Sequence, residues 1–271
     1  MRDADVDTLW GNDMTEFLKI EKDGHILRVT LNRPERRNAL STPICHGLID
    51  LPAQVEADMD IRCVVITGAG EGFCSGADLK ERKEGDETAR WDYVELVDRA
   101  LLDIEKIPVP VISAVNGHAL GGGTELALSC DIRLAVKHAE FGLTETGIGI
   151  IPTGSIVRLL RDGYDALNSL LTYTAGRFSA AQMLEMGFIQ QVADDVPQLM
   201  DRTDVLARQI AQNAPLALRA AKKVKRTLAI GKTAEAMESA EAIRRTLDGT
   251  ADCLEGLAAF AEKRDPIFTG R

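Results

Sequence analysis

Apolar residues recur along the chain with two spacings, and their order predicts how helices and strands alternate. Residues 17–31 hold two short apolar runs around Asp23-Gly24, a pattern typical of a β-hairpin. Residues 92–107 place their apolar positions on one face of a helix, whereas residues 63–70 form a short apolar run that ends in glycines. The same criteria predict a helix from Thr42-Pro43, a strand in "PVPVISAVNG", a helix in "TELALSC" and a strand in "DIRLAV". This alternation indicates an α/β fold with parallel strands.

The last third of the sequence has the period of helices. Ser179 and Gln182 fit a capping box, and helices are expected at 200–212, 215–230 and 233–262, the last with a break near Gly249. The middle helix carries the basic stretch "RAAKKVKR", which we interpret as a solvated helix face.

Composition narrows the possible partners. The chain has 271 residues, of which 45% are hydrophobic and only 4% aromatic, so the core must consist mainly of Ala, Leu, Ile and Val. The net charge of −10 and the pI near 5.0 argue against nucleic acid as the main partner. A small anionic ligand held by a local basic cluster remains compatible with this charge.

Cysteine usage and the apolar runs indicate a compartment. The five cysteines are odd in number and contain no CxxC spacing, which is typical of reduced thiols in a cytoplasmic protein. With four scattered histidines, a metal site is not expected. The acidic, polar N-terminus does not resemble a signal peptide, and the longest uncharged run, 107–124, contains two prolines. We therefore expect a protein that does not associate with membranes.

The stretch "NGHALGGGTELA" (116–127) places three glycines directly before a helix. A P-loop would need Lys at Gly123, a dinucleotide fingerprint would need Gly at Leu126, and no GxSxG is present. A remaining use is the helix N-terminus itself, where unpaired N–H groups and the helix dipole favour negative charge. An oxyanion hole needs two such donors, and glycine lets an oxygen approach them closely.

The segment "EGFCSGADLKE" (71–81) supplies a candidate second donor, so we expect the N–H groups of Ala77 and Gly122 to converge on one oxygen. The alternative is a pair of unrelated tight turns.

Two acidic residues lie near these two donors in the sequence. Glu125 lies on the first turn of the same helix and Glu145 lies in a nearly uncharged stretch, where a raised pKa would suit proton transfer. Either acid could instead be an ordinary charge at a helix start.

Four ordered motifs together resemble the enoyl-CoA hydratase/isomerase (crotonase) superfamily. They are "FCSGADLKE", "PVPVISAVNGHALGGGTELALSCDIRLA", "AEFGLTETGIGIIP" and "EGLAAFAEKRDPIFTGR", and the resemblance runs from about Phe17 to Arg271. It implies a crotonase-like ββα spiral core that binds an acyl-CoA, placed at 1–200, and a C-terminal helical oligomerisation region at 201–271. It also implies a homotrimer or a homohexamer built as a dimer of trimers.

The resemblance implies roles for single residues. Ala77 and Gly122 match the oxyanion-hole amides, and Glu125 and Glu145 match the two acids of the hydratases, whereas the isomerases typically keep only the second acid. The expected reaction is the reversible addition of water to a 2-enoyl-CoA, in fatty acid metabolism, without a cofactor other than the coenzyme A of the substrate. The residues expected to bind substrate and CoA are Arg36, Arg37, Ala39, Leu40, Ala77, Asp78, Leu79, Lys80, Gly121, Gly122, Phe260 and Lys263.

One segment departs from the family pattern. Many hydratases have a PGxGG-type stretch after the second acid, whereas this chain reads "IIPTGSIVRLL", and Thr144 replaces a commoner Pro. This segment helps to form the wall of the acyl pocket. The departure leaves three alternatives open, namely a double-bond isomerase, a hydrolase or a lyase of the same fold, besides a CoA-binding scaffold without catalysis.

Overall fold

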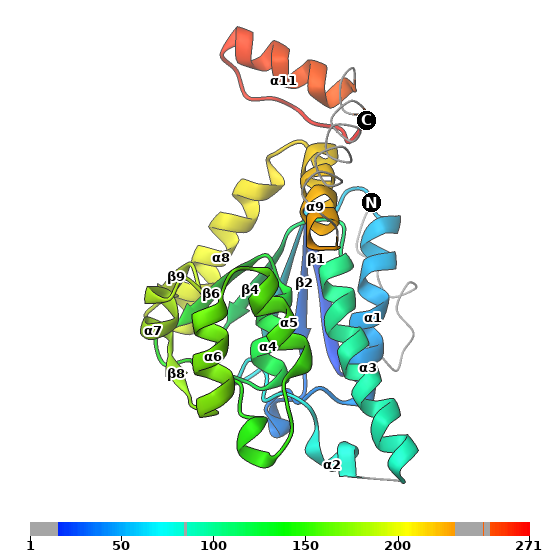
Figure 1. Cartoon of the computed structure of the whole chain (residues 1–271). Coiled ribbons are helices and arrows are strands. Elements are labelled where there is room, and N and C mark those ends of the chain that lie inside the picture. Colours follow the sequence, from blue (N-terminus) through cyan, green and yellow to red (C-terminus); the bar gives the residue numbers. More distant parts are fainter. Residues whose placement is uncertain (1–15, 84–85, 231–245, 247–249) are drawn as a thin grey trace.

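The main sheet has six strands in the order β1-β2-β3-β4-β6-β9 (Figure 1). The computed structural model describes residues 16–83, 86–230, 246 and 250–271. β1 and β2 form the predicted antiparallel hairpin, and each following pair is parallel. The strands are β1 Leu18–Asp23, β2 Ile26–Leu31, β3 Cys63–Gly68, β4 Val111–Val115, β6 Ile132–Val136 and β9 Gln191–Ala193. The predicted α/β class and its parallel strands are confirmed.

A second, smaller sheet lies beside the main one. Its strands are β5 Ala119–Leu120, β7 Glu140–Gly142 and β8 Phe178–Ser179. β5 pairs with β7 in parallel, and β7 pairs with β8 in antiparallel orientation. Because β5 leads directly into the glycine-rich stretch, this small sheet fixes where the following helix begins.

The helix starts follow local capping. α1 begins at Thr42 with Pro43 in its first turn, as predicted. α3 begins earlier than the predicted residue 92, because the Asp86 carboxylate accepts from the Ala89 N–H at 3.0 Å and caps it. The capping box of Ser179 and Gln182 opens α7 as predicted. The helices are α1 Thr42–Ala57, α2 Leu79–Lys83, α3 Glu87–Lys106, α4 Gly122–Ser129, α5 Thr153–Arg161, α6 Asp165–Thr174, α7 Ala180–Glu185, α8 Val196–Ala211, α9 Pro215–Ile230 and α11 Ala251–Glu262, with short 3₁₀ turns η1 Pro34–Arg36 and η2 Thr146–Ile148.

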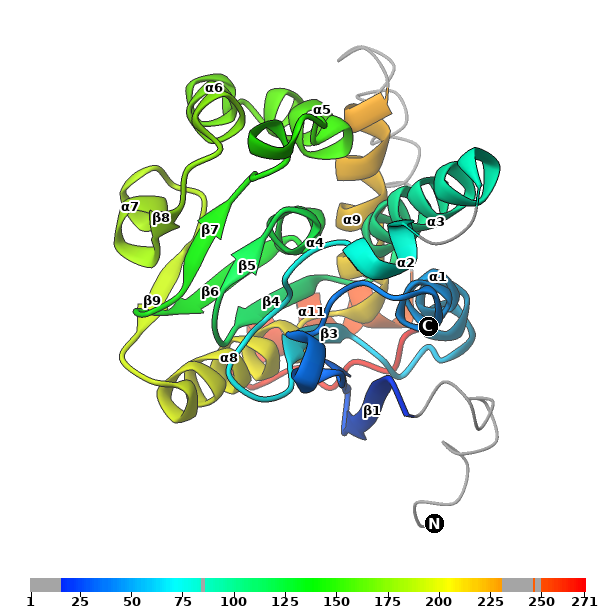
Figure 2. The same ribbon diagram turned by 90° about the horizontal axis from the view of Figure 1, so that it is seen from below.

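The layers leave one end of the parallel strands open. α8 covers one face of the main sheet, while the small sheet and α4 lie on the other, with α5 and α6 beyond them (Figure 2). α1 and α3 pack against each other beside this assembly. The core between the layers consists mainly of Val, Ile, Leu and Ala, as the low aromatic content predicted, with Phe73, Phe141 and Phe188 as its largest fully buried side chains.

α9 and α11 lie at one end of the molecule, and α2 lies at the other (Figure 1). The predicted helix 233–262 falls largely outside the described residues, and α11 is its described part. Position 200, predicted as a domain boundary, lies within α8; the division there stays a prediction. The basic stretch of α9 is not simply a solvated face, because Lys222 is only 7% exposed and pairs with Asp131. None of the described helices is long and apolar enough to cross a membrane.

Candidate active site

Two loops at the carboxyl ends of β3 and β4 are tied together by asparagine side chains. Asn116 Oδ1 accepts from the Gly68 N–H at 3.1 Å, and its Nδ2 donates to the Gly70 carbonyl at 3.0 Å. Asn38 Nδ2 donates to the carbonyl oxygens of Ala69 and Gly72. These contacts satisfy the buried polar groups of the turn after β3 and fix it against the turn after β4.

The peptide groups at Ala77 and Gly122 come next to each other. A Cβ on Gly122 would lie 3.5 Å from the Ala77 nitrogen, and one on Gly76 would lie 3.0 Å from the Gly122 nitrogen. Gly76 and Gly121 hold the turns with φ of +90° and +53°, a region that glycine adopts easily. Neither the Ala77 N–H nor the Gly122 N–H donates to any other part of the described chain. The two amides are therefore free donors around one small space.

Glu125 lies on the first turn of α4 and is only 5% exposed. Its Oε2 accepts from the Ser155 hydroxyl at 3.1 Å, and its Oε1 accepts from Nη1 of Arg158. Burial raises the pKa of this carboxyl, while the charge of Arg158 and the Ser155 hydrogen bond act in the opposite direction. The result is a buried acid whose direction is fixed by two side chains of α5.

Glu145 precedes η2 and lies on the other side of the glycine turn. Its Oε1 sits 2.9 Å from the position that a Cβ on Gly121 would take. Its Oε2 is buried and has no hydrogen-bond partner within the described part of the chain. Burial raises the pKa of this carboxyl, opposed by its own backbone N–H and by the charge of Arg82. An unpaired buried oxygen is costly, which marks it as a group available to a ligand.

One cavity of about 90 Å³ collects the four predicted catalytic residues. Ala77, Gly122, Glu125 and Glu145 all line it. The remaining wall is formed by Arg82, Tyr93, Val94, Val97, Asp98, Leu101, Ile150, Ile151, Pro152 and Thr153. Two amides without a partner in the described part of the chain and two acids thus line one cavity.

A groove of about 390 Å³ adjoins this cavity, because Ala77, Gly122 and Glu145 line both. It contains most of the residues predicted for the CoA path, namely Arg36, Ala39, Asp78, Leu79, Lys80 and Gly121. The Asp78 carboxylate caps the start of α2 by accepting from the Lys80 N–H at 2.9 Å, and it pairs with Arg33. Burial disfavours the ionised form of the Asp78 carboxyl, but Arg33 and the N–H groups of α2 outweigh this effect and lower the pKa of Asp78. Asp78 therefore orients the loop that carries Lys80.

Four predicted CoA residues are not brought to this groove. Leu40 is fully buried and its Cδ1 lies against Gly122, so it supports the turn from below. Arg37 is exposed and does not line the groove, because its left-handed backbone (φ +52°) belongs to the turn after η1. Lys263, at the end of α11, does not line it either, since α11 lies at the opposite end of the same chain (Figure 1). The Phe260 side chain falls outside the described residues.

The sequence interpretation missed several residues around the cavity. Arg158 contacts Glu125 directly, and Ser155 shares the same helix face three residues earlier, a spacing that the segment "TGSIVRLLR" displays. Tyr93 donates to the Leu40 carbonyl at 2.6 Å and accepts from the Asp78 N–H at 2.7 Å, which joins α3 to the oxyanion turn. No group of three or more His, Cys, Asp or Glu side chains able to hold a metal occurs in the described ranges.

Two amides without a partner in the described part of the chain and two buried acids, gathered beside the turns that follow β3 and β5, form the candidate active site. The sequence matches the profile of the family described as "Enoyl-CoA hydratase/isomerase" over residues 21–271. The chain belongs to this family, and the crotonase fold expected from its motifs is confirmed.

Two relatives and one solved structure show the range of the likeness. The chain is 38% identical over 256 residues to "Enoyl-CoA hydratase EchA19" of Mycobacterium tuberculosis, with 93% of this chain and 96% of the relative covered. It is 37% identical over 270 residues to "Carnitinyl-CoA dehydratase" of Escherichia coli, with 95% and 100% covered. The crystal structure of an enoyl-CoA hydratase from Bacillus anthracis superimposes with a TM-score of 0.89 at 36% identity, covering 94% of this chain and 100% of that one.

Proposed function

We propose that this enzyme is an enoyl-CoA hydratase, which adds water reversibly across the double bond of a 2-enoyl-CoA. The observation that carries this proposal is the presence of both acids, Glu125 and Glu145, in the cavity that also holds the free amides of Ala77 and Gly122. The coenzyme A of the substrate is the only cofactor expected. We also propose that the chain works as a homotrimer or homohexamer, in which a neighbouring subunit would bring Lys263 and Phe260 to the CoA groove.

The two amides suit a thioester oxygen. When water adds at Cβ, negative charge develops on this oxygen as the thioester becomes an enolate. Donors that are already in place stabilise this charge without reorganisation, and one such donor is worth about 2.7–4 kcal/mol in other enzymes. The N–H of Gly122 also lies at the start of α4, where the helix dipole favours negative charge.

The two acids suit the proton transfers. Glu125 would take a proton from the attacking water, and Glu145 would deliver a proton to Cα; the two roles reverse in dehydration. The ionised Glu125 is fixed by Arg158 and Ser155, whereas Glu145 keeps one oxygen without a partner among the described residues. Raised pKa values bring both groups closer to neutral pH, where general acids and bases act best.

The lining of the cavity leads us to expect a short acyl group. Ile150, Ile151 and Pro152, from the segment that departs from the family pattern, form part of the wall. We therefore expect crotonyl-CoA to be hydrated with a higher kcat/KM than long-chain enoyl-CoA.

A second candidate is the dehydration of a hydroxyacyl-CoA with a cationic end, and a single observation favours it. Asp98 of α3 is one of the residues that line the cavity. A carboxylate attracts a cationic group that comes close to it, and the attraction is stronger than in bulk water where protein covers part of the pair. The relative of 37% identity is named a carnitinyl-CoA dehydratase. Turnover of carnitinyl-CoA that is lost in Asp98→Asn, with crotonyl-CoA turnover retained, would establish this candidate.

Hydration of crotonyl-CoA, followed by the loss of enoyl absorbance, tests the main proposal. We expect Glu125→Gln and Glu145→Gln each to lower kcat by about 10²–10⁴-fold, the usual contribution of a positioned acid or base. Glu140→Gln, a change at a side chain on β7 that lines neither cavity, serves as the matched control. Mass spectrometry of the products separates the alternatives, because an isomer keeps the substrate mass, a hydrolase releases free CoA, and a hydratase adds 18 mass units, about the mass of one water. Binding of CoA esters without any product would favour the scaffold.

A further inference from the structure

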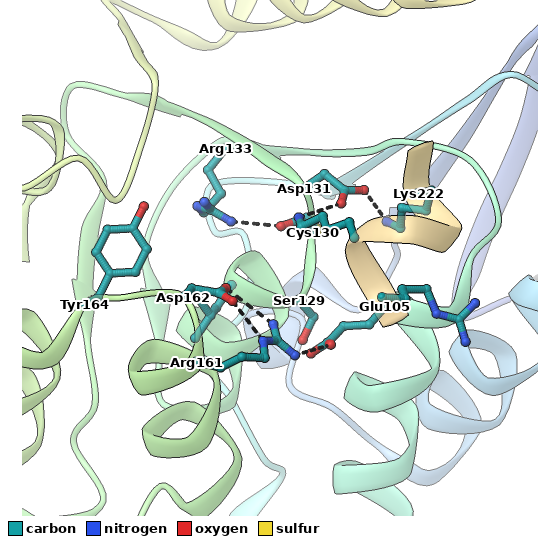
Figure 3. Close-up of a pocket in the computed structure, with 12 residues that line it drawn as sticks. Glu105, Ser129, Cys130, Asp131, Arg133, Arg161, Asp162, Tyr164 and Lys222 are labelled. Atoms are coloured by element: carbon teal, nitrogen blue, oxygen red, sulfur yellow. Dashed lines mark hydrogen bonds and ion pairs between the residues drawn. The ribbon is translucent and has the colours of Figure 1, made fainter. Parts of the chain in front are cut away.

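A row of alternating charges runs from the candidate active site through three helices to a second cavity. Its members are Glu125 on α4, Arg158 on α5, Glu105 on α3 and Arg161 on α5. The second cavity has a volume of about 390 Å³, and Glu105, Arg161 and Asp162 line it, with Arg161 bridging the two acids (Figure 3). The row therefore connects the proposed catalytic acid to solvent on the far side of α4.

Arg158 is the centre of this row. Its guanidinium is buried, with the residue 6% exposed, and it donates from Nη1 to Oε1 of Glu125 and from Nε to Oε1 of Glu105. Glu105 in turn accepts from Arg161 Nη1 at 2.6 Å through its other oxygen. The single positive charge of Arg158 is thus shared between two carboxylates, and only one of them lines the candidate active site.

The turn before Arg158 is shaped around this contact. A Cβ on Gly154 would lie 2.0 Å from Glu125 Oε1 and 2.6 Å from Arg158 Nη1, so no larger residue fits there without displacing the pair. Ser155, the next residue, holds the second oxygen of Glu125 at 3.1 Å. Three residues of α5 thus fix both oxygens of one carboxylate, a degree of positioning that packing alone does not require.

We propose that Arg158 is a positioning residue for the hydration reaction, which fixes the Glu125 carboxylate in its ionised form, and that Glu105 sets how strongly the arginine acts on it. This inference rests on the proposed function, since it takes Glu125 as the base that receives the proton of water. Arg158 does not line the cavity that holds the amides; it contacts Glu125 directly, and its charge also acts on Asp98 of the cavity wall. Glu105 acts one step further away.

Other charges also face Glu125 and must be counted. Asp98 of α3 and Glu145 before η2 oppose its ionisation, and Arg82 of α2 acts on both of these acids. Burial raises the pKa of Glu125 and Arg158 opposes that rise. Because the charge of Arg158 also opposes the rise in the pKa of Asp98, the variants of Arg158 and Glu105 are compared in an Asp98→Asn background as well, where a shift of Glu125 no longer passes through Asp98.

The two ends of the row predict shifts of opposite sign. In Arg158→Gln the cation is lost, and the pKa of Glu125 should rise by about one to three pH units, the usual effect of a close opposite charge. In Glu105→Gln the arginine keeps its charge but loses its second anion, so the pKa of Glu125 should fall by a smaller amount. Arg158→Lys should restore part of the wild-type value, because an ammonium group keeps the charge but cannot span both carboxylates.

The test measures the titration of Glu125 in two independent ways. The acid limb of the pH profile of kcat/KM with crotonyl-CoA gives it during turnover, and the ¹³C carboxyl shift of labelled glutamate, assigned by Glu125→Gln, gives it without turnover. Arg133→Gln is the matched control, because Arg133 is also 6% exposed but donates to the carbonyls of Phe188 and Cys130 instead of a carboxylate. The Arg133→Gln variant should be less stable than wild type, but the pKa of Glu125 should be the same as in wild type.

Each outcome decides one question. An upward shift in Arg158→Gln with a downward shift in Glu105→Gln supports the proposal, and it does so in the carbon spectrum even if the wild type hydrates no enoyl-CoA. In that case only the proposed function fails. A titration of Glu125 that moves in neither variant, or moves as in Arg133→Gln, overturns the proposal. If Arg158→Gln does not fold, Glu105→Gln decides alone by the sign of its shift.

Discussion

The two ends of the parallel strands bury polar groups to a similar degree but treat them in opposite ways. At the carboxyl ends, the N–H groups of Ala77 and Gly122 have no partner among the described residues, and neither does Oε2 of Glu145. At the amino ends, Asp131 precedes β6 and accepts from the Val111 N–H at 2.9 Å, from Lys225 at 2.9 Å and from Lys222. The acid at the first end keeps one oxygen without a partner, whereas both oxygens of the acid at the second end are paired.

The titration of the acids follows this difference. Burial raises the pKa of Glu145, and no cation of the described residues forms an ion pair with it. Burial also acts on Asp131, but Lys222 and Lys225 outweigh it and lower the pKa of Asp131. Since an unsatisfied buried group costs stability, a fold tolerates it where a ligand completes it. The comparison thus separates an acid whose charge is paired within the fold from an acid that keeps an unpaired oxygen in the candidate active site.

Asp131→Asn should give the largest effect on stability. The substitution leaves the Lys222 ammonium buried and without its anion, so we expect the free energy of unfolding to fall by about 3–5 kcal/mol. Denaturant titration measures it. Because the pKa of Asp131 is lowered on folding, the stabilisation is complete above the ordinary Asp pKa of about 3.9 and is lost as pH falls through the lower folded value. The gap between variant and wild type should therefore close in acid.

A surface acid provides the control for this variant. Asp194 pairs with Lys137, but their side chains are 72% and 63% exposed, so Asp194→Asn should cost less than about 1 kcal/mol. Asp131→Asn protein that remains folded should have the same kcat as wild type, because Asp131 does not line the cavity that holds the amides of Ala77 and Gly122. Equal losses of unfolding free energy in Asp131→Asn and Asp194→Asn would mean that the buried pair of Asp131 and Lys222 stabilises the fold no more than an exposed ion pair does.

Gly122→Ala should give the next largest effect, on activity. The new Cβ would lie 3.5 Å from the Ala77 nitrogen, in the space between the two amides, so it obstructs the oxygen that both donors would bind. We expect kcat to fall by about 10²–10³-fold, as for the loss of one oxyanion donor. The closest other contact of this Cβ, 3.2 Å to Leu40 Cδ1, requires only a small movement, so stability should change little.

Gly72→Ala, in the turn after β3, is the matched control, because a Cβ there meets no atom within 4 Å. Steady-state kinetics with crotonyl-CoA, together with thermal unfolding of each variant, separate activity from folding. A kcat that is unchanged in Gly122→Ala would exclude these amides as the oxyanion hole. The lack of partners for these two amides among the described residues would then need an explanation other than the binding of a thioester oxygen.

The sequence predicted features that depend on a few neighbouring residues. The hairpin at residues 17–31, the α1 start and the Ser179 capping box each follow from local chemistry, and the structure confirms them. The pairing of Ala77 with Gly122 was also predictable, because each follows a strand and glycine marks a close approach of the backbone. Whether these residues act as proposed stays a prediction until the kinetics are measured.

Contacts between distant segments could not be predicted in this way. Arg158 and Glu125 are 33 residues apart, and nothing near either one indicates the other. Lys222 looked like part of a solvated basic stripe, yet it pairs with Asp131, 91 residues away. The Leu40 side chain is buried beside Gly122, 82 residues away, while its backbone bridges to Ala77, so its expected backbone contact with CoA stays a prediction. Side chains find such partners only once the layers have packed, so pattern alone does not reveal them.

The smallest expected effect is a gain in stability from Glu145→Gln, and it tests the incomplete end directly. Folding raises the pKa of Glu145, so the folded state binds more protons than the unfolded state between the two pKa values, and stability falls as pH rises through that window. A neutral amide avoids this loss. We expect the variant to melt about 2–4 °C above wild type near pH 7.5, which corresponds to about 1 kcal/mol for a chain of this size. The gain should vanish near the ordinary Glu pKa of about 4.3, where the wild-type acid is already protonated.

Differential scanning calorimetry at both pH values measures the gain in melting temperature, with Glu140→Gln as the exposed control. A variant that melts below wild type at pH 7.5 would show that the Glu145 carboxylate stabilises the fold. Glu145 would then resemble Asp131 in its effect on stability, and the contrast between the two strand ends would be wrong.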